Sequence, residues 1–298
     1  MHPRIPLPAD LAGRPFTYSA GLAAGLGPGR LRGPDLQTPF FGVRHPSPVP
    51  LTITERCWAF QQRMPADAFF SSVTAARVMG VPLPSRHERD ALLHVAVPSP
   101  RRALAARGIV GHKVTLIGDD VRLWRGLRIS SPERAWCELS AVLPLPALVA
   151  AGDFLVQWRL PLSSIEAIGE TVTRYPARRR RAVLLEALGL LHDRSESPKE
   201  SELRVILVRA GIAGLEVNYP IPGTLYRGDL AIPGRKTVLE YQGEYHLDRD
   251  RWQADLMRIS RLQAVGWLVV QLAKRDLDDP VELVARIRAI LASRPVVS

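Results

Sequence analysis

Apolar residues in the last hundred positions recur with helical or strand spacing, and the order of the resulting elements is distinctive. Spacings of three and four residues predict helices, whereas short apolar runs bounded by Gly, Pro or Asp predict strands. The predicted helices are 197–211, 246–266 and 280–292, and the predicted strands are 215–221, 225–233, 237–243 and 267–272. The order is αβββαβ with one helix appended, which indicates an α/β domain with a mixed sheet flanked by helices.

The preceding 196 residues predict an irregular arm, a short α+β region and a helical connector. Residues 1–50 are rich in Pro and Gly and predict the irregular arm. Helical spacing marks 52–64, 71–81, 131–143, 144–158, 161–175 and 176–191, and strand patterns mark 92–98, 108–118 and 121–130. The polar stretch 192–201 contains Pro198 and predicts a domain boundary. The expected regions are therefore 1–50, 51–194 and 195–298.

The helices at 52–64 and 71–81 follow one another closely, as in a helix-turn-helix. Ser71 or Ser72 is expected to cap the second of them, and Gly80 is expected to end it. Ser131 is expected to cap the later helix at 131–143, with Pro132 in its first turn.

The net charge of +11 and the pI near 10.4 favour a polyanionic partner such as nucleic acid. Of the 40 basic residues 36 are arginine, a bias that a GC-rich genome also produces. Residues 195–298 hold 15 Lys and Arg against 14 Asp and Glu, whereas residues 1–194 hold 25 against 15. The excess positive charge therefore lies outside the last hundred residues.

Neither a membrane span nor a secretory signal is expected. The longest apolar stretch, 139–156, is interrupted by Pro144, Pro146 and Asp153 and is too broken to cross a bilayer. The N-terminus lacks the continuous apolar segment of a signal peptide. The expected location is the cytoplasm, with no membrane partner.

Two carboxylates on adjacent predicted strands form a candidate metal site. Asp229 and Glu240 lie eleven residues apart on either side of a turn, so antiparallel pairing would let them face one another. Gln242 projects from the same strand face as Glu240, since it is two residues away. Mg²⁺ or Mn²⁺ bound there would activate a water for phosphodiester hydrolysis. In the alternative interpretation, Asp229 and Glu240 are ordinary acids flanking a turn.

Other candidate residues have both a catalytic and a structural interpretation. Glu202, with Glu200 as the alternative, would reach the metal through water or simply favour the helix dipole. His246 would act as an acid or base, or cap its helix. Asp255 and Arg258, three residues apart, are expected to form an ion pair within their helix.

The ordered motifs of this region resemble a family of bacterial proteins grouped with Vsr-type endonucleases. The motifs are SPKESELR, RGDLAI, VLEYQGEYH, DLMR and LQAVGWLVVQ. The resemblance implies a PD-(D/E)XK, restriction-endonuclease-like core that acts on DNA. It also implies Asp229 and Glu240 as metal ligands and Glu202 and His246 as site residues.

Gln242 departs from this family pattern. The superfamily usually has lysine at this position and related sequences often have Asp, although some restriction endonucleases use Glu-x-Gln. An amide can orient a water but supplies neither a positive charge nor a proton acceptor. Gln242 therefore bears on the predicted activity and not on the predicted fold.

The front half resembles actinobacterial proteins whose N-terminal part is similar to AbiEi-type antitoxins. The residues that carry this resemblance are FFSSVTAARVMGVPLP and RGLRISSPERAWCEL. It implies a winged-helix-like DNA-binding unit and an alternative function, a regulator or antitoxin module whose nuclease fold is inactive. The run Arg178, Arg179, Arg180 and Arg181 would contact phosphates, or form a solvated helix face.

Overall fold

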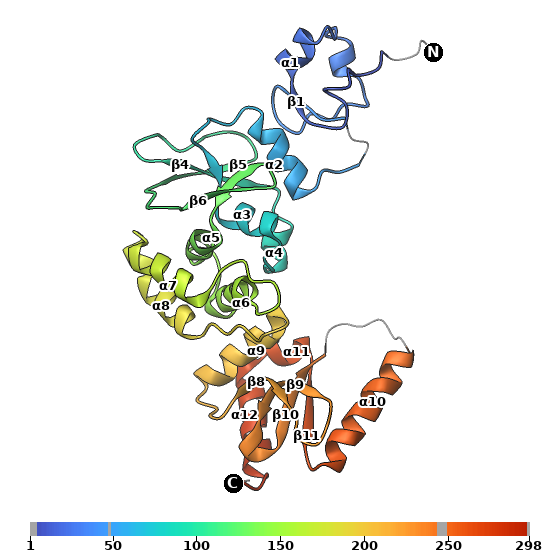
Figure 1. Cartoon of the computed structure of the whole chain (residues 1–298), viewed down its shortest axis with the longest axis vertical. Helices are drawn as coiled ribbons and strands as arrows, with labels where there is room; N and C mark the ends of the chain where they lie inside the picture. Colours follow the sequence, from blue (N-terminus) through green and yellow to red (C-terminus); the bar gives the residue numbers. More distant parts are fainter. Residues whose placement is uncertain (1–4, 47–48, 243–248, 297–298) are drawn as a thin grey trace. The chain divides into compact units, whose positions relative to one another are not determined.

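The chain divides into two units in the computed structural model, which describes residues 5–46, 49–242 and 249–296. The first unit comprises residues 1–139 and 173–178, and the second comprises 140–172 and 179–298 (Figure 1). Both units combine helices with sheets, and the α/β class is confirmed. The predicted boundary between residues 194 and 195 falls inside the second unit.

The described helices include none that is both long enough and apolar enough to span a bilayer.

The N-terminal segment of the first unit has a small core of its own and is more regular than the predicted irregular arm. Strands β1 (Phe16–Thr17) and β2 (Val43–Arg44) pair antiparallel, and helices α1 (Tyr18–Ala23) and η1 (Arg30–Arg32) lie between them in sequence. The buried side chains are Leu11, Phe16, Leu26, Leu31 and Leu36. Frequent Gly and Pro keep this apolar pattern from repeating, which hides it from a search for periodicity.

A five-stranded mixed sheet forms the centre of the first unit. Its order is β5-β4-β3-β7-β6, with β4 parallel to β5 and β3 parallel to β7. The strands are β3 (Phe69–Phe70), β4 (Leu93–Pro98), β5 (Ile109–Val114), β6 (Val121–Trp124) and β7 (Leu127–Ser130). The single strand expected at 121–130 is instead a hairpin. Its turn residues Arg125 and Gly126 have φ of 49° and 78°, as a tight hairpin turn requires.

The helices of the first unit are α2 (Ile53–Gln61), α3 (Ser72–Met79), α4 (Ser85–Glu88) and α5 (Pro132–Leu139). Residues 62–71 separate α2 from α3 and include strand β3, so the pair lacks the short turn of a helix-turn-helix. Gly80 ends α3 with a φ of 81°, as predicted. Ser71 is the N-cap residue, but its buried hydroxyl makes no capping hydrogen bond. Ser131 caps α5 as expected, accepting from the Arg134 N–H at 3.2 Å.

The second unit confirms the predicted order of elements after residue 197. It contains α9 (Pro198–Arg209), β8 (Glu216–Pro220), β9 (Arg227–Ile232), β10 (Thr237–Tyr241), α10 (Arg249–Ala264), β11 (Leu268–Leu272) and α12 (Pro280–Ala292). The short helices η3 (Pro233–Arg235) and α11 (Lys274–Asp278) are additional. The preceding helices are α6 (Leu145–Val156), α7 (Ile165–Arg174), η2 (Arg178–Arg180) and α8 (Arg181–Gly189).

The four-stranded sheet of the second unit has the order β11-β10-β9-β8, and apolar clusters cover both of its faces. Strand β10 is parallel to β11 and antiparallel to β9, which is antiparallel to β8. One cluster joins Leu203 and Leu207 of α9 and Leu283 and Ile287 of α12 to Leu230, Ile232, Leu239 and Leu272. The other joins Leu262 of α10 to Ile221, Ala231, Val238 and Trp267. Helices therefore flank the sheet on both sides (Figure 1).

Candidate active site

Strand pairing in the second unit brings polar residues into one row across the sheet. The paired residues Leu239 and Leu230 fix the register of β10 on β9, and one further step places Glu240 opposite Asp229. The register of β8 on β9 places Asn218 opposite Asp229 in the same way. Side chains alternate along a strand, so Asp229 and Glu240 share the sheet face of Ala231 and Val238, which α10 covers.

Asp229 lies in β9 and is half-buried, next to the end of β10. Its Oδ2 accepts a hydrogen bond from the Tyr241 backbone N–H at 3.1 Å, which fixes the carboxylate against the neighbouring strand. Burial raises the pKa of Asp229; the Tyr241 N–H and the Arg258 charge oppose this rise, and the Glu196 carboxylate adds to it. The Tyr241 N–H and Arg258 therefore compensate only part of the cost of a charged Asp229 beside other acids.

Glu240 is 1% exposed, and Arg258 of α10 occupies both of its oxygens. Arg258 Nη1 and Nη2 each donate at 2.6 Å, one to Oε1 and the other to Oε2. Burial raises the pKa of Glu240, Arg258 opposes this rise and Asp229 adds to it, and the net pKa is about 7. The predicted pair of Arg258 with Asp255 is present only at 3.9 Å, so Glu240 is the main partner.

Helix α9 contributes a third carboxyl, that of Glu200. We call the set of Asp229, Glu240 and Glu200 the acidic row. Glu202 Oε2 instead accepts from Lys199 Nζ at 2.6 Å. Glu200 is buried, and burial and then the Asp229 charge raise its pKa. Its Oε2 accepts from the Glu196 N–H at 2.9 Å. Of the two predicted candidates, Glu200 is the one whose pKa the Asp229 charge affects, and it is buried, whereas Glu202 is partly exposed.

Gln242 follows β10 directly, and its backbone N–H donates to the Leu272 carbonyl of β11 at 2.7 Å. Two residues from Glu240, its side chain belongs to the same sheet face. His246 lies outside the described residues.

The acidic row fits a hard divalent cation in its chemistry, but its side chains are not gathered around one point. Among the described residues, no group of three or more His, Cys, Asp or Glu side chains is close enough to hold an ion. Burial nevertheless raises the pKa values of Glu200, Asp229 and Glu240 together. A divalent cation prefers such carboxylate oxygens and would compensate their charge. Coordination by Glu240 requires Arg258 to leave at least one of its oxygens.

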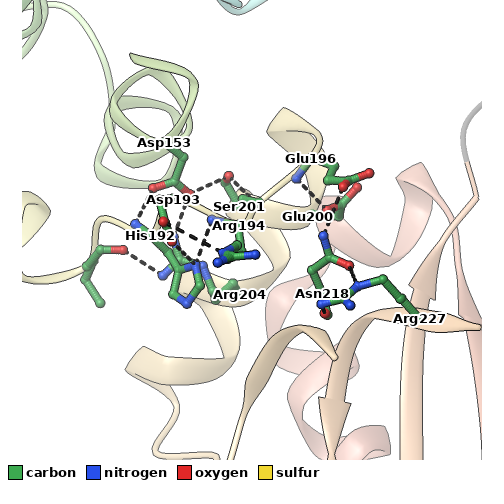
Figure 2. A network of polar contacts seen from close by, with 12 residues as sticks. Asp153, His192, Asp193, Arg194, Glu196, Glu200, Ser201, Arg204, Asn218 and Arg227 are labelled. Atoms are coloured by element: carbon green, nitrogen blue, oxygen red, sulfur yellow. Dashed lines mark hydrogen bonds and ion pairs between the residues drawn. The ribbon is translucent and has the colours of Figure 1, made fainter. Parts of the chain in front are cut away.

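A buried polar network holds the start of α9 against α6 (Figure 2). Asp153 of α6 is 2% exposed and accepts three hydrogen bonds. The donors are the His192 N–H at 2.8 Å, Ser201 Oγ at 2.6 Å and Arg204 Nη2 at 2.6 Å. Ser201 directly follows Glu200, so this network also positions the Glu200 backbone.

An exposed tryptophan of the second unit, Trp158, contacts two arginines, one of which pairs with Glu196. Trp158 is 45% exposed, and the guanidinium carbons of Arg159 and Arg194 each lie 5.0 Å from its ring centroid. Arg159 Nη2 also lies 3.1 Å from Glu196 Oε1, which accepts from Asn218 Nδ2 at 2.9 Å. Aromatic and guanidinium groups in this combination suit nucleotide bases and phosphates.

The arginine run at 178–181 is exposed along its length. Arg180 donates to the Ala141 carbonyl at 3.3 Å, and Arg181 donates to the Val172 carbonyl at 3.0 Å. These hydrogen bonds tie part of the run to the backbone, and none of them reaches the acidic row.

Arg258 and Trp158 were not predicted from the sequence as site residues. For Arg258 a signal existed, because it lies four residues before Leu262, the apolar residue that anchors α10 on the sheet. Residues four apart share a helix face, so Arg258 faces the sheet. No comparable periodic signal marks Trp158, which lies in a loop after α6.

No family model matches the chain. It is similar to two proteins of Mycobacterium tuberculosis, "Uncharacterized protein MT2308" of strain CDC 1551 / Oshkosh and "Uncharacterized protein Rv2248" of strain ATCC 25618 / H37Rv. Each is 28% identical over 206 residues, which cover 67% of this chain and 74% of the relative. Their names state no activity.

Proposed function

We propose that the second unit is a Mg²⁺- or Mn²⁺-dependent endonuclease-like enzyme that hydrolyses phosphodiester bonds in DNA. The observation that carries the proposal is the row of Asp229 and Glu240 on adjacent strands, joined by Glu200 from α9. Burial raises the pKa values of all three carboxyls, a pattern typical of functional sites. The order αβββαβ and the resemblance of the motifs to those of proteins grouped with Vsr-type endonucleases also favour this function. An enzyme that acts on DNA would work in the cytoplasm.

Each residue of the row has a separate task in this proposal. Asp229 and Glu240 would hold the cation, and Glu200 would bind it through water. The bound cation supplies a water of lowered pKa and polarises a phosphate oxygen. Gln242 would orient the attacking water through its amide, since it cannot take up a proton. His246 remains a candidate for protonating the leaving oxygen.

The charge of the first unit supports DNA as the partner. This unit holds 20 Lys and Arg against 10 Asp and Glu, whereas the second unit holds 20 against 19. The hairpin of β6 and β7 presents Arg122, Arg125 and Arg128 as exposed side chains. In this proposal the first unit anchors DNA by neutralising its phosphates, and the second unit cleaves it.

The second candidate is a DNA-binding regulator, similar to AbiEi-type antitoxins, whose nuclease-like unit has lost its activity. Two observations favour it: Gln242 provides no charge, and Arg258 occupies both oxygens of Glu240. In this second candidate function, the protein would also have a toxin as a partner.

Nicking of supercoiled plasmid separates the two candidates. Purified wild-type protein is expected to nick DNA with Mg²⁺ or Mn²⁺ and not with a chelator. Asp229→Asn should lower the rate by at least about 100-fold, because it removes a ligand charge. Asp255→Asn, one turn from Arg258 on α10, is the matched control and should retain most of the activity. Nicking that survives Asp229→Asn would refute the proposed site, and DNA binding without nicking would favour the regulator.

A further inference from the structure

The acidic row needs a positive charge that Gln242 does not provide. In phosphodiester hydrolysis the phosphate gains negative charge, and a cationic side chain stabilises that charge. Lys199 in the same unit is paired with Glu202 at 2.6 Å. Among the described residues, Arg258 is the cation whose charge acts on both Asp229 and Glu240.

Arg258 has the position and the shape to bind a phosphate. Leu262, four residues further along α10, is fully buried and holds this helix face on the sheet. The Arg258 side chain is 23% exposed, so its guanidinium reaches from buried Glu240 towards solvent. A guanidinium binds carboxylates and phosphates with the same pair of parallel N–H groups. The Arg258 guanidinium can therefore move from a carboxylate to a phosphate without a change in its hydrogen-bonding geometry.

We infer that Arg258 is the phosphate-binding cation of this site and that it leaves Glu240 when a divalent cation binds. The inference deepens the proposed function and depends on it. Without metal, ionised Glu200, Asp229 and Glu240 together with Arg258 sum to a charge of −2. A divalent cation brings the sum to zero, so Arg258 is then free to pair with a phosphodiester instead of Glu240. Arg258 thus keeps Glu240 paired while the site is free and pairs with the phosphate when substrate is bound.

The first test measures Mn²⁺ affinity without DNA, from the electron paramagnetic resonance signal of free Mn²⁺. Arg258→Met removes a positive charge that competes with the metal for Glu240, so Mn²⁺ should bind on the order of tenfold more tightly. Arg258→Lys should have an intermediate affinity, because an ammonium lacks the paired N–H groups. Arg261→Met is the matched control, since Arg261 lies on the same helix but donates to Tyr226 Oη at 2.8 Å. Its Mn²⁺ affinity should equal that of wild type.

The second test measures binding of a DNA duplex with and without Ca²⁺, a hard cation that uses the same oxygen ligands. Wild type and Arg261→Met should bind DNA more tightly with Ca²⁺. Arg258→Met should lose most of this gain, and Arg258→Lys should keep part of it. A merely structural role of Arg258 would lower metal and DNA affinity together, whereas the inference requires them to change in opposite directions.

The outcomes separate this inference from the proposed function. If wild type binds Mn²⁺ and both Arg258 variants bind it equally or more weakly, Arg258 is not the exchanging cation and the proposed function stands. If Arg258→Met does not fold, the Arg258→Lys affinity decides in the same way. Binding by Arg258→Met but not by wild type would support the inference. Absence of Mn²⁺ binding in every variant would overturn both proposals.

Discussion

Two stacked histidines in the first unit are the clearest pH-sensitive residues outside the acidic row. His94 Nδ1 lies 3.0 Å from His112 Nε2, and the ring centroids are 5.1 Å apart. A hydrogen bond between two imidazoles requires at least one neutral ring. Burial is the largest cause that lowers the pKa of His94; His112 and His87 also lower it, Asp90 opposes them, and the net pKa is about 4. The folded protein therefore keeps His94 neutral at pH values where the unfolded chain protonates it.

This shift predicts that acid destabilises the first unit. Between pH 6.5 and 4 the unfolded chain binds the extra proton, so the free energy of unfolding falls as pH falls. The loss attributable to His94 is at most about 3 kcal/mol. Urea unfolding at several pH values should show a smaller loss in His94→Gln than in wild type. His87→Gln is the control, and an unchanged pH dependence in His94→Gln would contradict the prediction.

Helix α6 contributes one buried acid that the second unit needs to keep α9 in place. Asp153→Ala leaves the Arg204 guanidinium buried without its carboxylate, which should lower the free energy of unfolding by about 3 to 5 kcal/mol. Asp193→Ala is the control, because its exposed contact with Arg194 at 3.8 Å is worth less than about 1 kcal/mol. Guanidinium unfolding of the full chain gives both values. Similar losses in the two variants would show that the buried pair does not stabilise the unit.

The elements after residue 197 could be predicted because each strand is a short apolar run between strong turn residues. Helix α6 was also predicted, within 144–158, but the side chains against which it packs were not. Most of its residues are apolar, so the sequence does not show which face of α6 packs against which element. In the sequence, Asp153 interrupts an apolar stretch and gives no sign of its partner Arg204. Contacts between residues 51 positions apart leave no periodic trace in the sequence.

The acidic row was predicted only in part. The register of β9 and β10 follows from the turn between them, which is why Asp229 and Glu240 could be paired in advance. Glu200 and Glu202 differ only in helix face, and the spacing to Leu203 and Leu207 distinguishes them. The role of Arg258 could be seen only from the packing of α10 on the sheet. In the sequence, an ion pair with nearby Asp255 already accounted for its charge.

At the scale of the whole molecule, the charge asymmetry predicts where DNA binds. Alanine at both Arg125 and Arg128 should weaken duplex binding, and the dependence of the logarithm of affinity on the logarithm of salt concentration should fall by about 2. Alanine at both Arg209 and Arg288, two exposed arginines of the nearly neutral second unit, is the matched control. Binding titrations from low to high salt measure both slopes. Equal effects of the two double variants would mean that the first unit is not the anchor.

The buried contact between α6 and α9 also sets an order of events during synthesis. Asp153 leaves the ribosome 51 residues before Arg204, an interval of roughly 3 to 10 seconds at ordinary translation rates. Throughout that interval α6, whose Leu148, Val149 and Leu155 are buried in the finished protein, has no α9 to pack against. During this interval the nascent chain exposes the apolar side chains of α6 and an Asp153 carboxylate without its Arg204 partner. This is the stage of synthesis at which binding by a chaperone would protect the chain most.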